Sequence, residues 1–168
     1  KILIEGGADA KHEDADGQNA MNIAALFDHR DIVKILIEEG VDVNHADYAI
    51  YPCKGETPLF SAIRNENKEM LMLIIDAGAD VNHENAAGNN ALDYAVENGY
   101  GQRIEKDDHA DIVKMLIEAG ADVNVALTQE NWSPYGETPH FKASQKGNKE
   151  IYKLLIAAGA DLNHENSW

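Results

Sequence analysis

Residues 57–82 read TPLFSAIRNENKEMLMLIIDAGADVN, and this stretch decides the fold. Thr57 can accept hydrogen bonds from amides at a helix N-terminus, and Pro58 suits the first helical position because that residue needs no intrahelical N–H bond. The apolar residues 70–75 indicate a second helix, and Gly78 permits the left-handed turn that closes a helix. The stretch therefore predicts two short helices followed by a turn.

The closing turn recurs along the whole chain. A Gly-Ala-Asp or Gly-Val-Asp phrase occurs five times, and a second glycine follows the first four phrases by 10, 15, 10 and 16 residues. The phrases begin at Gly7, Gly40, Gly78, Gly120 and Gly159, and the second glycines are Gly17, Gly55, Gly88 and Gly136. A single helix pair cannot bury its apolar surface alone, so the repetition predicts helix pairs stacked in a row.

Each predicted first helix begins at an equivalent polar residue. The four residues are Asn19, Thr57, Asn90 and Thr138, and we expect their side-chain oxygens to cap the helices. An alanine stands five residues after each cap, at Ala24, Ala62, Ala95 and Ala143. A small side chain at this position lets neighbouring helices approach closely, so the alanines are predicted to be packing positions.

These residues resemble the ankyrin repeat, whose pattern is a Thr-Pro-Leu-His-like helix start, an alanine pair and a closing Gly-Ala-Asp-Val-Asn. The resemblance covers essentially the whole chain and implies an all-α fold, an ankyrin-repeat solenoid of stacked helix pairs with projecting β-turn fingers. The histidine of the pattern is replaced by Asn22, Phe60, Asp93 and Phe141. His140 takes a usually apolar place. We expect these changes to alter the hydrogen bonding at the helix starts and the packing of the last repeat.

The landmarks divide the chain into repeats of a single domain, residues 1–168. We expect a partial repeat at 1–16 and repeats at about 17–49, 50–87, 88–129 and 130–168. Residues 1–4 repeat the sequence Lys-Ile-Leu-Ile of residues 34–37, which predicts that the chain starts inside a second helix. We therefore expect a fragment of a longer protein.

Charge and composition narrow the classes of partner. Thirty acidic and fourteen basic residues give a net charge of -16, which repels nucleic acid and attracts basic partners. The simpler explanation of this charge is a solubilising shell, and the alternative is a groove for a basic peptide. No apolar run approaches the ~20 residues of a membrane span. The single cysteine, Cys53, is compatible with a reducing compartment. We expect an intracellular (cytoplasmic) protein, or one secreted into a host cell if it is a bacterial effector.

The sequence predicts neither an enzyme nor a cofactor or metal site. Histidines share one register at His12, His45, His83 and His164. Equivalent positions in stacked helical units lie ~8–10 Å apart, too far for zinc, which holds each nitrogen at ~2 Å. They are predicted to form a surface row. Cys53 has no histidine partner in register, and the acidic residues form no spaced catalytic pair.

By resemblance to ankyrin domains, partners bind the concave side formed by the fingers and the first helices. The residue after each finger glycine and the pair that ends each first helix are expected to face solvent there. Among these we select Leu26, Phe27, Glu56, Arg64 and Glu137 as partner-binding residues. Leu26 and Phe27 are apolar at positions where exposure is expected, which predicts a role in binding. The alternative is that a preceding repeat covers them.

Two fingers are enlarged, at residues 47–54 and 125–135. They carry four of the eleven aromatic residues, Tyr48, Tyr51, Trp132 and Tyr135. Aromatic side chains often anchor interfaces, so we predict that these fingers grip a partner; the alternative is that they fold back as a small satellite core. A third insertion, between Tyr100 and Asp108, is interpreted as a flexible excursion, with a second docking site as the alternative.

The leading hypothesis is a protein–protein interaction module that binds a protein or peptide on its concave face and long fingers. The negative charge of the chain predicts that this partner is basic. The alternative is a structural spacer within a larger multidomain protein or bacterial effector. A further hypothesis is modification of the turn asparagines, because they resemble those that an oxygen-dependent hydroxylase modifies in ankyrin repeats. They are Asn44, Asn82, Asn124 and Asn163.

Overall fold

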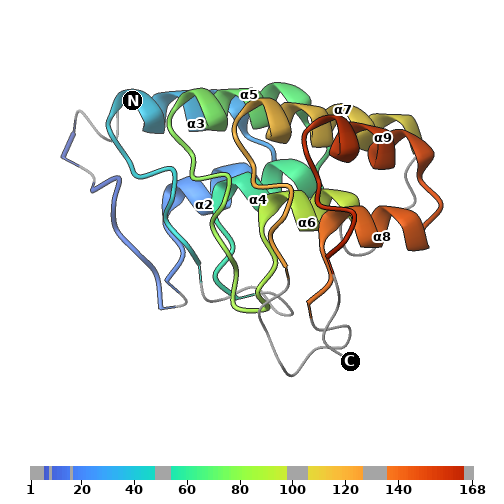
Figure 1. Cartoon of the computed structure of the whole chain (residues 1–168). Helices are drawn as coiled ribbons and strands as arrows, with labels where there is room; N and C mark the ends of the chain where they lie inside the picture. The colour runs from blue at the N-terminus through green and yellow to red at the C-terminus, as the bar shows by residue number, and fades with distance from the viewer. Residues whose placement is uncertain are drawn as a thin grey trace. The chain divides into compact units, whose positions relative to one another are not determined.

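The computed structural model is helical, and its helices come in antiparallel pairs (Figure 1). The described residues are 6–7, 9–15, 17–47, 54–97, 106–126 and 136–164. Two compact units divide the chain, Lys1–Asp80 and Val81–Trp168, which we call unit 1 and unit 2. Within the described residues, no helix has the length and apolar character needed to cross a membrane.

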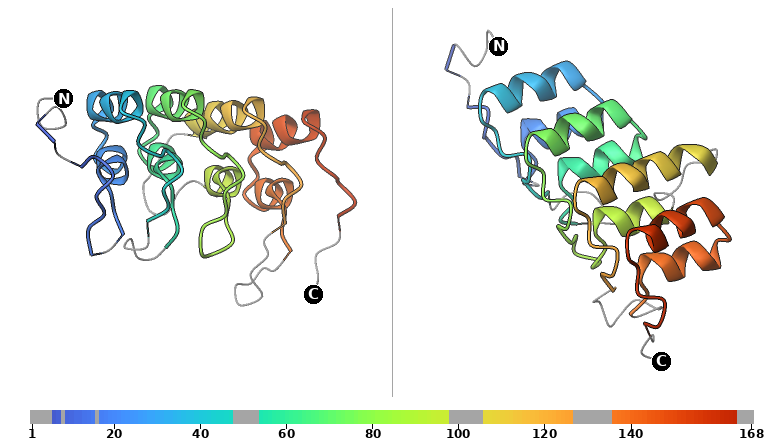
Figure 2. Two further views of the ribbon diagram at one scale, coloured as in Figure 1. Left: turned by 90° about the vertical axis from the view of Figure 1, so that its left-hand side faces the viewer. Right: turned by 45° about the horizontal axis from the view of Figure 1, so that its top comes forward.

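The described residues of unit 1 form two helix pairs. The first pair is α2 (Ala20–Leu26) and α3 (Arg30–Glu38), and the second is α4 (Pro58–Arg64) and α5 (Lys68–Asp76). Helix α2 packs against both α3 and α4. The first helices of the pairs therefore form one layer and the second helices another, as Figure 2 shows.

Unit 2 repeats this arrangement. Its pairs are α6 (Ala91–Val96) with α7 (Lys106–Glu118), and α8 (Pro139–Gln145) with α9 (Lys149–Ala157). Helix α6 packs on α8, and α7 packs on α9. The third insertion, predicted as an excursion between two helices, is helical in part because α7 begins at Lys106.

The predicted packing alanines lie in the core of each unit. All four are buried: Ala24, Ala62, Ala95 and Ala143. Around them pack larger apolar side chains, such as Leu59 and Met70 in unit 1 and Leu92 and Leu116 in unit 2. The small residue allows the two layers to approach closely, so the prediction from the sequence is confirmed.

The helix caps agree with the sequence in part. The side chain of Asn19 accepts from the amides of Met21 and Asn22, and Asn90 accepts from Asp93. Neither Thr57 nor Thr138 makes the predicted cap bond through its hydroxyl group. In both helices the third amide donates instead to the threonine carbonyl oxygen, at 3.0 Å, which satisfies the group that a hydroxyl would have capped.

The second helices end at the repeated glycines, as predicted. Gly78 has a φ of 93°, and the amide of Ala79 donates back to the carbonyl of Ile74 at 3.2 Å. This left-handed closure suits glycine because residues with a side chain rarely adopt a positive φ of this size. The chain then turns into the next finger, which we define as the segment between a second helix and the next first helix.

The turn asparagines link adjacent repeats inside each unit. Asn124 donates to the carbonyl of Gly159 at 3.3 Å and accepts from the amide of Asp161 at 2.7 Å. Asn82 makes the same two bonds to the next repeat in unit 2, and Asn44 makes them in unit 1. At these three turns, one asparagine side chain therefore satisfies two backbone groups of the next repeat.

Replacing Asn124 with alanine is expected to lower the free energy of unfolding by about 1–2 kcal/mol, because two hydrogen bonds are lost. Asn124→Asp keeps the acceptor and should cost less than the alanine. Urea denaturation followed by circular dichroism measures both. Equal stability of Asn124→Ala and the wild type would show that the ladder contributes nothing.

Candidate functional site

Two sets of sequence-selected residues meet on the first-helix layer. The first set stands directly before each helix cap and consists of Gln18, Glu56, Asn89 and Glu137. The second set stands seven residues after each cap and consists of Leu26, Arg64, Glu97 and Gln145. In unit 1 the guanidinium of Arg64 donates to the carboxylate of Glu56. In unit 2 the amide of Gln145 donates to Glu137 at 2.6 Å. The fold thus brings together Glu56 and Arg64, which were selected at two different register positions.

The expectation that Glu56 and Glu137 face solvent is wrong. Each has an exposed fraction of 2%, and the equivalent Asn89 is also buried. The polar partner seven residues after the cap compensates the desolvation of each glutamate, which allows burial beneath it. Arg64 remains partly exposed, and the buried Glu56 carboxylate holds its guanidinium in place. Of these two residues, Arg64 at the end of the first helix is the one that solvent can reach.

The apolar pair at the end of α2 divides in the structure. Leu26 is half-buried, and Asn65 donates to its carbonyl oxygen at 3.0 Å. Phe27 has an exposed fraction of 64%, and its ring lies 6.3 Å from that of His29. Phe27 is therefore exposed as the sequence predicted, whereas Leu26 lies against the next repeat.

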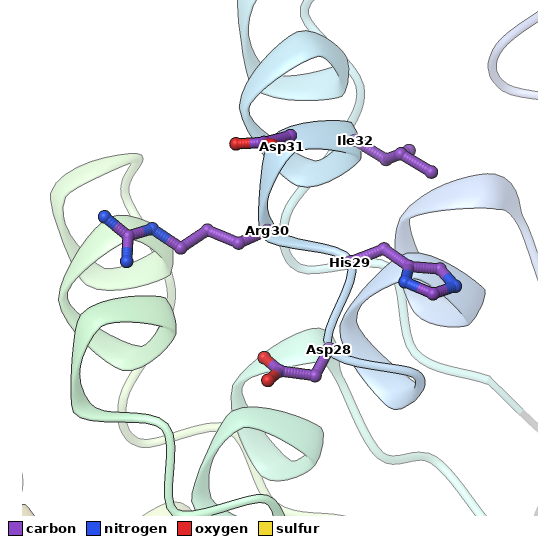
Figure 3. Close-up of a pocket in the computed structure, with 5 residues that line it drawn as sticks. All are labelled: Asp28, His29, Arg30, Asp31 and Ile32. Carbon is purple, nitrogen blue, oxygen red and sulfur yellow. The ribbon is translucent and has the colours of Figure 1, made fainter.

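A depression of about 440 Å³ lies at the turn between α2 and α3 (Figure 3). His29 and Ile32 extend to one side of the turn in this view, and Arg30 extends to the other. Asp28 accepts a hydrogen bond from Asn67 at 2.7 Å. The lining side chains do not converge on a common point, so the depression has no arrangement for catalysis.

Unit 2 contains a buried ionic cluster that the sequence did not reveal. Lys142 of α8 lies 3.3 Å from Asp93 and 3.3 Å from Glu97, both at or beside α6. Asp93 is 0% exposed and Lys142 2%, whereas the side chain of Glu97 is 34% exposed. The sequence did contain a sign of this cluster. The residues equivalent to Lys142 in the other repeats are uncharged: Ile23, Ser61 and Tyr94. A single charged residue at this position indicates an unusual contact.

Burial dominates the electrostatics of this cluster. Desolvation raises the pKa of Asp93 to about 6, although the nearby Lys142 ammonium lowers it in part. Burial also raises the pKa of Glu137, while its hydrogen bond from Gln145 opposes the rise. The carboxylates of Asp93, Glu97 and Glu137 interact with the Lys142 ammonium, and the Lys146 ammonium lies 3.0 Å from the Glu97 carbonyl oxygen. Three carboxylates against two ammonium groups leave this part of the first-helix layer with an excess of negative charge.

The histidine register connects fingers. A ring nitrogen of His45 lies 2.8 Å from the carbonyl of Gly17, and that of His164 lies 3.1 Å from Gly136. Two members of the predicted surface row therefore bond to a neighbouring finger. In the part of the chain that the structure describes, no three metal-binding side chains come together. The enlarged-finger residues Tyr48, Tyr51, Trp132 and Tyr135, together with Cys53, lie outside the described residues.

Comparison with known proteins identifies the repeat. A family model described as ankyrin repeats in three copies matches residues 1–47, 45–126 and 104–166. The chain belongs to the ankyrin-repeat family. A crystal structure of an ankyrin repeat domain from Acinetobacter baumannii AYE is 32% identical, with a TM-score of 0.78, over 95% of this chain and 74% of that chain. Comparison with curated proteins finds no match.

This ankyrin-repeat chain departs from the family pattern at the histidine position, with a different result in each repeat. Asn22 preserves the hydrogen bonding, because it completes a capping box with Asn19 and donates to the carbonyl of His45 at 2.9 Å. Phe60 is buried, and Asp93 joins the ionic cluster. His140, in the apolar place, is buried and bonds through Nδ1 to the Thr138 hydroxyl at 2.7 Å. Ankyrin repeats are generally protein–protein interaction modules and are typically non-enzymatic.

Proposed function

We propose that the chain binds a basic protein or peptide through its first-helix layer and its enlarged fingers. The excess negative charge around Lys142 carries this proposal. Glu97 is the accessible member of the cluster, and a cationic side chain of a partner would add the positive charge that the cluster lacks. The net charge of -16 would attract such a partner over longer distances.

Two further groups of residues are proposed to contact the partner, each within its own unit. Arg64, supported by Glu56, provides a rigid polar contact in unit 1, because its guanidinium is already held. Trp132 and Tyr135 of one enlarged finger, and Tyr48 and Tyr51 of the other, supply the aromatic anchors. These four residues are assigned from the sequence, since large aromatic side chains dominate interface energetics.

A displayed peptide library selected on the chain tests this proposal. The selected peptides should be rich in lysine and arginine, and their affinity should fall as salt is added. Trp132→Ala combined with Tyr135→Ala should weaken binding at least tenfold, or by about 1.4 kcal/mol, while the unfolding temperature stays unchanged. A large loss of stability with unchanged affinity would instead assign both residues to a local core.

The charge contribution is tested by Glu97→Gln, with Glu118→Gln as the matched control. Glu118 is 66% exposed on α7 and pairs only loosely with Lys114, at 3.9 Å. Glu97→Gln should reduce the salt dependence of peptide binding, and Glu118→Gln should not. Absence of any selected peptide, together with equal tolerance of substitutions on both layers, would favour the structural spacer.

A further inference from the structure

The carboxylate of Asp93 is sealed inside unit 2 and depends on its immediate neighbours for its charge. The side chain is 0% exposed, so water does not stabilise the ionised form. Two groups favour that form, the ammonium of Lys142 at 3.3 Å and, more weakly, the backbone of Asn90. The charge of Asp93 is therefore tied mainly to one ammonium on the neighbouring helix.

The same ammonium also serves a carboxylate that solvent reaches. Lys142 Nζ lies 3.3 Å from Glu97 Oε1 as well as from Asp93 Oδ1, and the side chain of Glu97 is 34% exposed. Lys142 is itself only 2% exposed, so carboxylates compensate its charge in place of water. When Asp93 is neutral, the whole ammonium charge acts on Glu97. A group that solvent does not reach thus sets the charge at the accessible edge of the cluster.

The charge balance of the cluster changes by one within an accessible pH range. With every group ionised, three carboxylates stand against the ammonium groups of Lys142 and Lys146, which leaves one negative charge in excess. A proton on Asp93 removes that excess. Burial raises the pKa of Asp93 to about 6, so the change falls between neutral and mildly acidic pH.

We propose that Asp93 regulates partner binding at this cluster, which holds a lysine or arginine of the partner firmly when Asp93 is ionised and weakly when Asp93 takes up a proton. This regulation rests on the proposed function, in which a cationic side chain docks at Glu97. The excess negative charge attracts that side chain, and it disappears with the proton. By linkage the bound cation favours the ionised form, so binding releases the proton of Asp93.

The other titratable side chains of the helices packed on α6 leave this assignment unchanged. His109 of α7 and His140 of α8 are both buried, but neither is among the groups that shift the pKa of Asp93. Glu137, directly before the cap of α8, has a pKa that burial raises, so it loses charge in the same direction on acidification. It is present in the wild type and in Asp93→Asn, and a comparison of the two isolates Asp93.

Calorimetric titration of the whole chain with a synthetic peptide of lysine, arginine and glycine tests the regulation. Such a peptide keeps its side-chain charge between pH 5 and pH 7. The wild type should bind it about three- to tenfold more weakly at pH 5 than at pH 7. Tenfold is the limit, because the ionised fraction of a group with a pKa of about 6 falls about tenfold over this range.

Two variants provide the comparison. Asp93→Asn should bind at pH 7 about as weakly as the wild type does at pH 5, and its affinity should change less than about twofold between the two pH values. The amide fits this position, because Asn22 occupies the equivalent place in α2. Glu118→Gln is the matched control, since Glu118 is 66% exposed on α7, and it should keep the full pH dependence.

Proton release gives a second measurement that needs no variant to fold. Titrations at pH 6 in buffers of different ionisation enthalpy should show that the wild type releases about 0.3–0.5 proton for each peptide bound. Binding without this release, or with equal pH dependence in the wild type and Asp93→Asn, would overturn the regulation and leave the proposed function standing. No binding at either pH would overturn both.

Discussion

Replacing Lys142 with methionine is expected to lower the free energy of unfolding at neutral pH by about 1–3 kcal/mol. Asp93 is 0% exposed and lies 3.3 Å from the Lys142 ammonium. Methionine fills a similar volume but removes the charge, so Asp93 must either remain ionised in an apolar site or take up a proton. Urea denaturation at neutral pH measures the loss.

Two controls separate charge from packing. Adding Asp93→Asn to Lys142→Met should recover most of the lost stability, because the uncompensated charge is then removed. Lys114→Met removes an ammonium whose side chain is 60% exposed and should change the unfolding free energy by less than about 0.5 kcal/mol. A cost below about 1 kcal/mol for Lys142→Met would mean that the cluster does not stabilise the fold.

Acidification is expected to stabilise the folded chain through Asp93. Its pKa is about 6 in the folded state against 3.8 for the exposed group, so the folded state binds the proton more tightly between these values. The ionised carboxylate therefore costs the folded state on the order of 2–3 kcal/mol above pH 6, and this penalty disappears as the pH falls through the window toward 3.8. Between pH 7 and pH 5 the gain due to Asp93 should be about 1–1.5 kcal/mol.

Comparison with Asp93→Asn isolates this contribution. The amide does not titrate, so the difference in stability between wild type and variant should change by that amount between the two pH values. His140 acts in the opposite direction, because burial lowers its pKa and acid then favours the unfolded state. It is present in both proteins and cancels. A constant difference across this pH range would show that Asp93 titrates at its ordinary pKa.

Much of the fold followed from residues whose effect is local. The glycine at the end of each second helix provides a left-handed turn, and the asparagines Asn19 and Asn90 cap the helices that follow. The alanines five residues after each cap set the spacing of the layers. These features depend on backbone conformation within a few residues, so each copy predicted the same local structure, and repetition of one unit predicted the stack.

The candidate site followed from the sequence in part. Register placed Phe27 and Arg64 on accessible turns and helix ends, and both are accessible in the structure. The register also predicted that Glu56 and Glu137 face solvent, but both are buried. The register specifies which face of a repeat a residue occupies, but whether a glutamate lies on that face or beneath it depends on a partner seven residues after the cap.

The sequence by itself determined the helix pairs, their order and the turns between them, because glycine conformation, capping and apolar periodicity act over short distances. Only the tertiary structure decided that Lys142 pairs with Asp93 and that two threonine caps use their carbonyl oxygens. The ionic pair depends on what the neighbouring repeat supplies within a few ångströms, and residues some 50 positions apart meet there only after the helices stack.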